Sequence, residues 1–195
     1  MIDSAVKNAF INTKPSLPSQ ITLDTIIIRL IIIDQIDSTS LSKNFGTGGY
    51  QALARSIFNA NLEDKIAHHQ PISNPDFQSI AIRKSVSGGK NGKFFSIVTK
   101  YIAKTASLCY GYDDGYPIYD GVLHNHLHLY INALTKTKME NIRQTCDYEK
   151  YCLEINNFLS NLNNKLAPTN KITNLMFDHI VWFSYKKPNA PQKYN

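Results

Sequence analysis

A lysine and an aspartate near the middle of the chain are the residue types best suited to covalent chemistry. Lys100 and Asp120 lie in the segment 94–122, FFSIVTKYIAKTASLCYGYDDGYPIYDGV, which runs from an apolar-patterned stretch into a turn rich in Tyr, Gly and Asp. A deprotonated amine is a nucleophile, and a carboxylate stabilises positive charge that develops beside it. We expect the helix and the turn to bring the two groups into one pocket; the other interpretation is a basic helix face in solvent.

Lys104 is a candidate second amine, because it lies one helical turn after Lys100. Apolar residues of 94–109 recur at helical spacing, and both lysines fall at the edge of that stripe. An edge position buries the stem of a lysine while its amine faces a cleft. Two ammonium groups this close repel each other, which favours the neutral amine of one of them. Lys104 is therefore either the cationic neighbour of a nucleophilic Lys100 or a rival nucleophile.

Neither the histidines nor the cysteines form a recognisable metal site. His124, His126 and His128 would share one face of a strand, but they spread over more than half the circumference of a helix. No acidic or cysteine residue beside them completes a ligand set. The three cysteines form no CxxC pair, which indicates free thiols in a reducing compartment. We expect packing or surface histidines and no metal or other cofactor.

A glycine-rich, basic stretch, SVSGGKNGK (85–93), is a candidate contact for nucleic acid. It fails the phosphate-loop pattern, because Phe94 stands where Ser or Thr should follow the Gly-Lys pair. One interpretation is a flexible, solvated turn. In the other, Lys90, Gly92 and Lys93 meet a phosphate backbone through their amines and backbone amides.

Composition and charge favour a soluble protein with an anionic partner. Of the 195 residues, 43% are hydrophobic and 18% charged, the net charge is +6, and the pI is about 9.1. Such a basic chain makes nucleic acid the first partner to consider. The most apolar run, 26–33, is interrupted by Arg29 and is too short to span a bilayer, and no signal-peptide pattern is present. We expect a cytoplasmic protein without membrane contact, and no pattern specifies an oligomeric state.

Helical periodicity dominates the chain. Apolar residues recur at the spacing of a helix in four segments, 50–61, 94–109, 148–162 and 175–183. A short helix capped by Asp76 is also expected to continue through Ile82. The isoleucine-rich segment 21–36 is ambiguous, because its β-branched content favours a buried strand and its length favours a buried helix. The whole pattern predicts an all-α, multi-helix bundle.

No composition break or internal repeat divides the chain. Pro15 and Pro18 end a short N-terminal helix, so residues 1–20 are expected to form an N-terminal arm. A single helical domain then covers 21–187. The tail 188–195 is expected to be disordered, because it is basic and contains proline.

The segment around Lys100 and Asp120 resembles the helix-hairpin-helix (HhH-GPD) DNA glycosylases, the group that includes endonuclease III and the 8-oxoguanine glycosylases. In those enzymes a Lys at the start of a helix is followed, after a loop, by an Asp that precedes another helix. The Thr99-Lys100 pair and the Pro117-Ile118-Tyr119-Asp120 turn look like that arrangement. Segments 30–45 and 177–187 are similar to the family's early buried helix and closing helix, so the resemblance extends over 21–187.

The same blocks also resemble a group of uncharacterised bacterial proteins with the pattern FxxxTKY…YPIYD, a pattern without a settled activity. Two features of the glycosylases are absent. Residues 95–98 replace the glycine-containing hairpin turn that normally precedes the lysine, and the iron–sulphur cysteines of some members are missing.

The resemblance implies a glycosylase/AP lyase acting on double-stranded or damaged DNA. A base would flip out of the duplex, Lys100 would attack the sugar C1′ and form a Schiff base, and Asp120 would stabilise the charge on the sugar. Tyr116 would stack on a base, or else belong to the core. Two alternatives stay open. One is a non-catalytic nucleic-acid-binding domain with a buried Lys–Asp pair; the other is an interaction protein of a mobile element or defence system.

Overall fold

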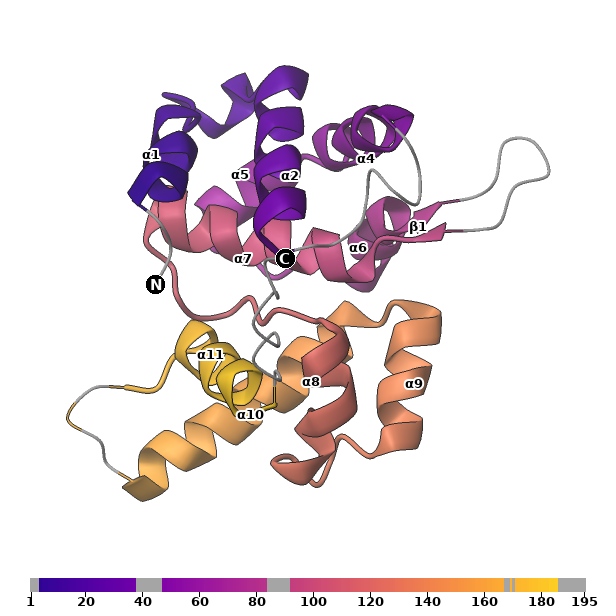
Figure 1. Cartoon of the computed structure of the whole chain (residues 1–195), viewed down its shortest axis with the longest axis vertical. Coiled ribbons are helices and arrows are strands. Elements are labelled where there is room, and N and C mark those ends of the chain that lie inside the picture. Colours follow the sequence, from indigo (N-terminus) through magenta and orange to yellow (C-terminus); the bar gives the residue numbers. More distant parts are fainter. Residues whose placement is uncertain (1–3, 38–46, 84–91, 167–168, 170, 186–195) are drawn as a thin grey trace, which may run out of the picture.

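The isoleucine-rich segment forms a helix, α2 (Leu23–Asp37), in a computed structural model of the chain (Figure 1). The structure describes residues 4–37, 47–83, 92–166, 169 and 171–185. Ile26, Leu30 and Ile33 of α2 are completely buried at helical spacing, whereas Ile28 and Ile31 are 45% and 40% exposed. As a helix, the segment therefore packs one apolar face into the core. Its backbone N–H and C=O groups form their hydrogen bonds within the helix.

Helices account for nearly all of the described secondary structure, so the all-α prediction is confirmed. Before the central helix come α1 (Ser4–Asn12), the 3-10 turn η1 (Pro18–Gln20), α4 (Thr47–Asn59), α5 (Leu62–Ala67) and α6 (Asn74–Ala81). The central and later helices are α7 (Phe95–Tyr110), α8 (Gly121–His126), η2 (Leu127–Leu129), α9 (Lys136–Thr145), α10 (Tyr148–Leu166) and α11 (Asn174–Tyr185). Two-residue strands, β1 (Ile82–Arg83) and β2 (Gly92–Lys93), pair antiparallel.

The helices lie in two groups (Figure 1). The first group contains α1, α2 and α4 to α7, and the second contains α8 to α11. A non-helical segment from Gly111 to Asp120 joins them. Gly111 ends α7 in the left-handed conformation, with φ of 76°, which a glycine adopts without steric cost.

Helix α7 is the element on which the first group is packed. It contacts α1, α2, α5 and α6, and its buried residues include Val98, Tyr101, Ile102 and Ala106, all fully enclosed. Its burial on most sides explains why Lys100, at the edge of the apolar stripe, is also nearly buried.

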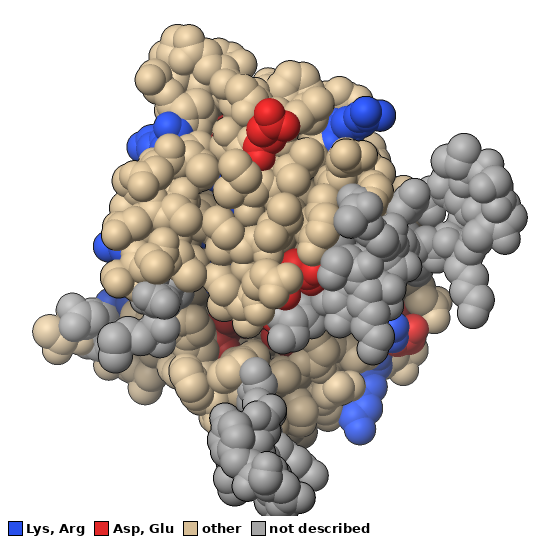
Figure 2. Space-filling model, turned by 45° about the horizontal axis from the view of Figure 1, so that its top comes forward, with Lys and Arg blue, Asp and Glu red and all other residues tan. Residues whose placement is uncertain are grey.

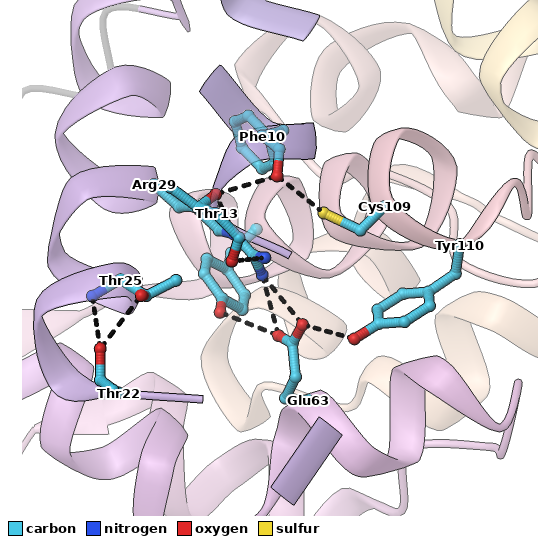
Figure 3. A network of polar contacts seen from close by, with 9 residues as sticks. Phe10, Thr13, Thr22, Thr25, Arg29, Glu63, Cys109 and Tyr110 are labelled. Atoms are coloured by element: carbon cyan, nitrogen blue, oxygen red, sulfur yellow. Dashed lines mark hydrogen bonds and ion pairs between the residues drawn. The ribbon is translucent and has the colours of Figure 1, made fainter. Parts of the chain in front are cut away.

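A buried ion pair fixes the helices around α7 (Figure 3). Nη1 of Arg29 donates to both carboxylate oxygens of Glu63, at 3.0 and 2.9 Å, and the two side chains are 0% and 1% exposed. Arg29 also donates through Nη2 to the Thr13 carbonyl oxygen at 2.8 Å. The hydroxyls of Tyr101 and Tyr110 donate to Glu63 at 3.3 and 2.7 Å. These contacts give both buried charges hydrogen-bond and ion-pair partners, without which their burial would destabilise the fold.

The structure corrects two sequence-based expectations about local structure. The described part of the expected N-terminal arm, residues 4–20, also packs on the core, because α1 contacts α7 and its Phe10 is completely buried. The helix expected after Asp76 begins earlier, at Asn74, because Ser73 is the N-cap and its hydroxyl accepts from the Asp76 amide. The expected disordered tail, 188–195, lies outside the described residues.

None of the helices in the described part of the chain has both the length and the apolar character needed to cross a membrane.

Candidate functional site

Lys100 and Asp120 line the same cavity, which has a volume of about 440 Å³. Each side chain is 8% exposed. Lys100 comes from α7 in the first helical group, and Asp120 immediately precedes α8 in the second, so the cavity lies where the two groups meet. The other lining residues are Ile36, Asp37, Ser96, Gly121, Val122, Asn125, His126 and Trp182.

Thr99 ties the segment before Asp120 to the helix that carries Lys100. The Tyr119 amide donates to the Thr99 hydroxyl oxygen at 3.0 Å, and the same hydroxyl lies 3.3 Å from the Tyr119 carbonyl oxygen. Thr99 is fully buried, so neither group has water as an alternative partner. The residue before Lys100 thus holds the residue before Asp120, and this contact sets the two functional groups at one cavity.

Three tyrosines hold the rest of this segment. The hydroxyls of Tyr148 and Tyr151, both on α10, donate to the carbonyl oxygens of Pro117 and Ile118 at 3.1 and 2.7 Å. The ring of Tyr119 stacks on Phe95 of α7, with ring centroids 4.2 Å apart. Because the backbone is bonded on successive residues, the segment reaches Asp120 in a defined conformation without being part of a helix.

Asp120 is the N-cap of α8. One of its carboxylate oxygens, Oδ1, accepts from the Leu123 amide at 2.9 Å. An N-cap bond fixes the side-chain rotamer and places the carboxylate at the positive end of the helix. Asp120 is therefore held against the cavity wall with one oxygen committed to α8.

Lys104 is paired rather than exposed to the cavity. Its Nζ lies 3.4 Å from Oδ2 of Asp37 at the end of α2, and the side chains are 11% and 20% exposed. This is an ion-pair distance without hydrogen-bond geometry, since Asp37 Oδ2 has no hydrogen-bond partner among the described residues. Asp37 lines the cavity and Lys104 does not, so the carboxylate of Asp37 lies between the Lys104 amine and the cavity.

The predicted nucleic-acid contacts lie away from this cavity or outside the described residues. Lys90 is not described, and the structure describes only the backbone of Gly92 and Lys93, which form β2. Tyr116 is 6% exposed, and its hydroxyl donates to the Gln70 carbonyl oxygen at 2.7 Å. It does not line the cavity of Lys100 and Asp120, and its ring lies edge-on to His69 in the loop after α5.

The three alternating histidines lie on helical turns and have separate environments. His124 Nδ1 and the Tyr119 hydroxyl are hydrogen-bonded at 2.6 Å, and burial lowers the pKa of His124. His126 donates through Nδ1 to the Val122 carbonyl oxygen and stacks on Tyr185, with ring centroids 4.0 Å apart. His128 belongs to η2. No group of three or more potential metal ligands occurs within the described ranges.

Sequence reasoning missed Asp37, Asp178 and Trp182 as residues of this region. A signal for Asp178 was present, since it is an acidic residue on the mostly apolar helix α11. Acidic residues are rarely buried unless they are paired, so such a position indicates either a partner or a function.

On the face shown in Figure 2, the described Lys and Arg side chains are spread around the rim. They do not gather into one patch on the described part of that face. Several basic residues of the sequence, among them Lys84, Lys90 and Lys186, lie outside the described residues. The net charge of +6 is therefore distributed over described and undescribed segments alike.

No family model matches the chain, and neither a curated protein nor a solved structure is similar to it.

Proposed function

We propose that this chain is a DNA-binding protein of the DNA glycosylase type, in which Lys100 forms a Schiff base with a deoxyribose and Asp120 stabilises the sugar cation. The observation that carries this proposal is the shared cavity of Lys100 and Asp120. An HhH-GPD-like bundle is part of the proposal, and it is supported by the cavity whose lining includes Lys100 from the first helical group and Asp120 at the start of the second.

The chemistry follows from the two side chains. After the Lys100 ammonium loses a proton, the Nζ lone pair attacks C1′, and the glycosidic bond breaks with its electron pair on the departing base. Asp120 lowers the energy of the positive charge that grows on the sugar during this step. Ring opening and proton loss give an imine, and its electron-withdrawing nitrogen permits elimination of the 3′ phosphate.

Borohydride trapping tests the covalent step. The protein is incubated with a duplex oligonucleotide containing one abasic site, and reduction should convert the imine into a stable protein–DNA adduct. Lys100→Gln should abolish the adduct. Lys104→Gln is the matched control, because it removes a nearby lysine that is paired with Asp37, and it should retain the adduct. Absence of an adduct with the unsubstituted protein, or an undiminished adduct with Lys100→Gln, would refute the proposal.

A non-catalytic nucleic-acid-binding protein on the same scaffold is the second candidate. The observation that favours it is the low exposure of Lys100 and Asp120, 8% each, which is typical of structural residues. Binding of an undamaged duplex that weakens steeply with salt, combined with no adduct on abasic DNA, would support this candidate. Absence of both signals would exclude it as well.

A further inference from the structure

A second cavity, about 620 Å³ in volume, lies apart from the one that Lys100 and Asp120 line. Its lining comes from α10, the loop after α5, the segment that joins α7 to α8, and the residues before α11. Most of the lining residues are polar, and none of them lines the cavity of Lys100. The chemistry proposed above therefore makes no use of this second cavity.

Side-chain hydrogen bonds fix the walls of the second cavity. Asn174, at the start of α11, is buried; its Nδ2 donates to Asn156 Oδ1 at 3.0 Å, and its Oδ1 accepts from the Gly115 amide at 2.8 Å. Asn163 of α10 holds the main chain of Ile172, accepting from its amide at 2.9 Å and donating to its carbonyl oxygen at 3.0 Å. The cavity is thus formed by the protein's own contacts, which reduces the entropy lost when a ligand binds.

The charged groups of the lining are paired with each other. Lys171 Nζ lies 2.8 Å from Asp114 Oδ2. His69 is also held, because its Nε2 donates to the Asp114 carbonyl oxygen at 3.0 Å and its ring stacks on Tyr112. A phosphate binds best to an unpaired cation, and an ammonium group to an unpaired carboxylate. The described lining offers neither, so it favours a ligand without net charge.

One face of α10 supplies hydrogen-bonding groups that the described chain leaves unused. Asn156, Ser160 and Asn164 lie on successive turns and line the cavity. The Asn156 Nδ2, the Ser160 hydroxyl and the Asn164 amide form no hydrogen bond with other described residues. Asn is a poor helix former because its amide competes for backbone hydrogen bonds, yet α10 contains five asparagines, three of which line this cavity. Their concentration on this face indicates a role in binding.

We propose that the second cavity binds a neutral sugar. A sugar hydroxyl both donates and accepts hydrogen bonds, as do the amide and hydroxyl side chains of this face of α10. Leu159 and Ile172 also line the cavity and offer apolar contact to the C–H groups of a sugar ring. A nucleobase would instead need a free aromatic face for stacking, and the ring of His69 is already stacked on Tyr112. The volume falls within the range of small-molecule sites.

NMR titrations of the isotope-labelled, full-length protein test the inference. Glucose, mannose, galactose and N-acetylglucosamine are each added up to about 50 mM, which measures dissociation constants in the millimolar range. At least one of these sugars should shift the backbone amide signals of Gly115, Asn156 and Ile172 in a saturable way. If none of them does, or if saturable shifts occur only at amides away from the cavity, the proposal is overturned.

Asn156→Asp is the main variant, because it keeps the oxygen that accepts from Asn174 and replaces the unused amide nitrogen with an oxygen that cannot donate. It should weaken sugar binding about tenfold. Ser160→Ala tests the same face without a change of charge and should weaken binding about threefold. Asn157→Asp is the matched control, since its side chain lines a different cavity, and its affinity should be unchanged. The spectrum of each variant reports whether it folds, and undiminished binding by either folded test variant overturns the proposal.

A phosphorylated sugar separates a neutral sugar site from an anion site. Because Lys171 is paired with Asp114, a phosphate should add no affinity, and the phosphate ester of the sugar that binds should bind no more tightly than the sugar itself. An ester that binds more than about tenfold more tightly, or inorganic phosphate that shifts the same amides, would show an anion site and overturn the assignment. None of these measurements involves DNA or Lys100, so their outcome is independent of the proposed function.

Discussion

Replacing Asp178 with Asn should make the protein more stable at neutral and alkaline pH, by an amount that grows with pH. Asp178 is 9% exposed on α11, and Asn has nearly the same shape but carries no titratable proton. The effect follows from the raised pKa of the native carboxyl group, about 7 compared with a usual value of 3.8, caused first by burial and then by Asp120.

The direction and size of the effect follow from proton linkage. Between about pH 4 and about pH 7 the folded protein keeps the Asp178 proton, whereas the unfolded chain releases it, so stability falls as pH rises. Each pH unit in this window costs about 1.4 kcal/mol, and the interval of roughly three units gives at most about 4 kcal/mol, reached in full above pH 7. Asn has no proton to release, so Asp178→Asn should lack this loss.

Urea denaturation followed by circular dichroism, at intervals from about pH 4.5 to about pH 8.5, measures the difference. The free energy of unfolding of Asp178→Asn, minus that of the unsubstituted protein, should increase with pH by about 2–4 kcal/mol. Asp24→Asn, an exposed position on α2, shows the effect of removing one negative charge from the surface. A difference that is constant across the series, or one that decreases with pH, would refute the burial argument for Asp178.

Three further predictions concern the framework of the site. Gly115→Ala should destabilise the protein by about 1–3 kcal/mol in urea denaturation, because Gly115 has φ of 90° and a Cβ there would lie 2.6 Å from His69 Nε2. The control, Gly48→Ala, places its Cβ in open space and should not lower the free energy of unfolding. Glu63→Gln should lower the free energy of unfolding by about 3–5 kcal/mol, since it leaves the buried Arg29 charge without its anionic partner, and an unchanged midpoint would contradict this. Thr99→Val removes the acceptor of the Tyr119 amide; it should cost about 1–3 kcal/mol and slow trapping on abasic DNA, whereas Thr99→Ser should restore both.

The helices were largely predictable because their signal is local. Segments 50–61 and 148–162, expected from apolar spacing, correspond to α4 and α10. For segment 21–36 the sequence allows both a strand and a helix, because periodicity cannot separate the two when a long apolar run is buried on most sides. The start of α6 was misplaced, since Ser73 and Asp76 are both good caps and only the backbone geometry at Ser73 distinguishes them.

The amino-acid sequence is enough to predict the helical character, the basic charge and the region of Lys100 and Asp120, since these depend on residue types and short-range spacing. It did not determine that Asp37 from α2 and Trp182 from α11 line the same cavity, or that Asp178 lies beside it. A helix specifies which of its faces is apolar, but many partners can cover that face. Which helices meet, and which polar side chains are then buried together, depends on the packing of the whole chain. The raised pKa of Asp178 belongs to that packing, because it arises from groups on other helices.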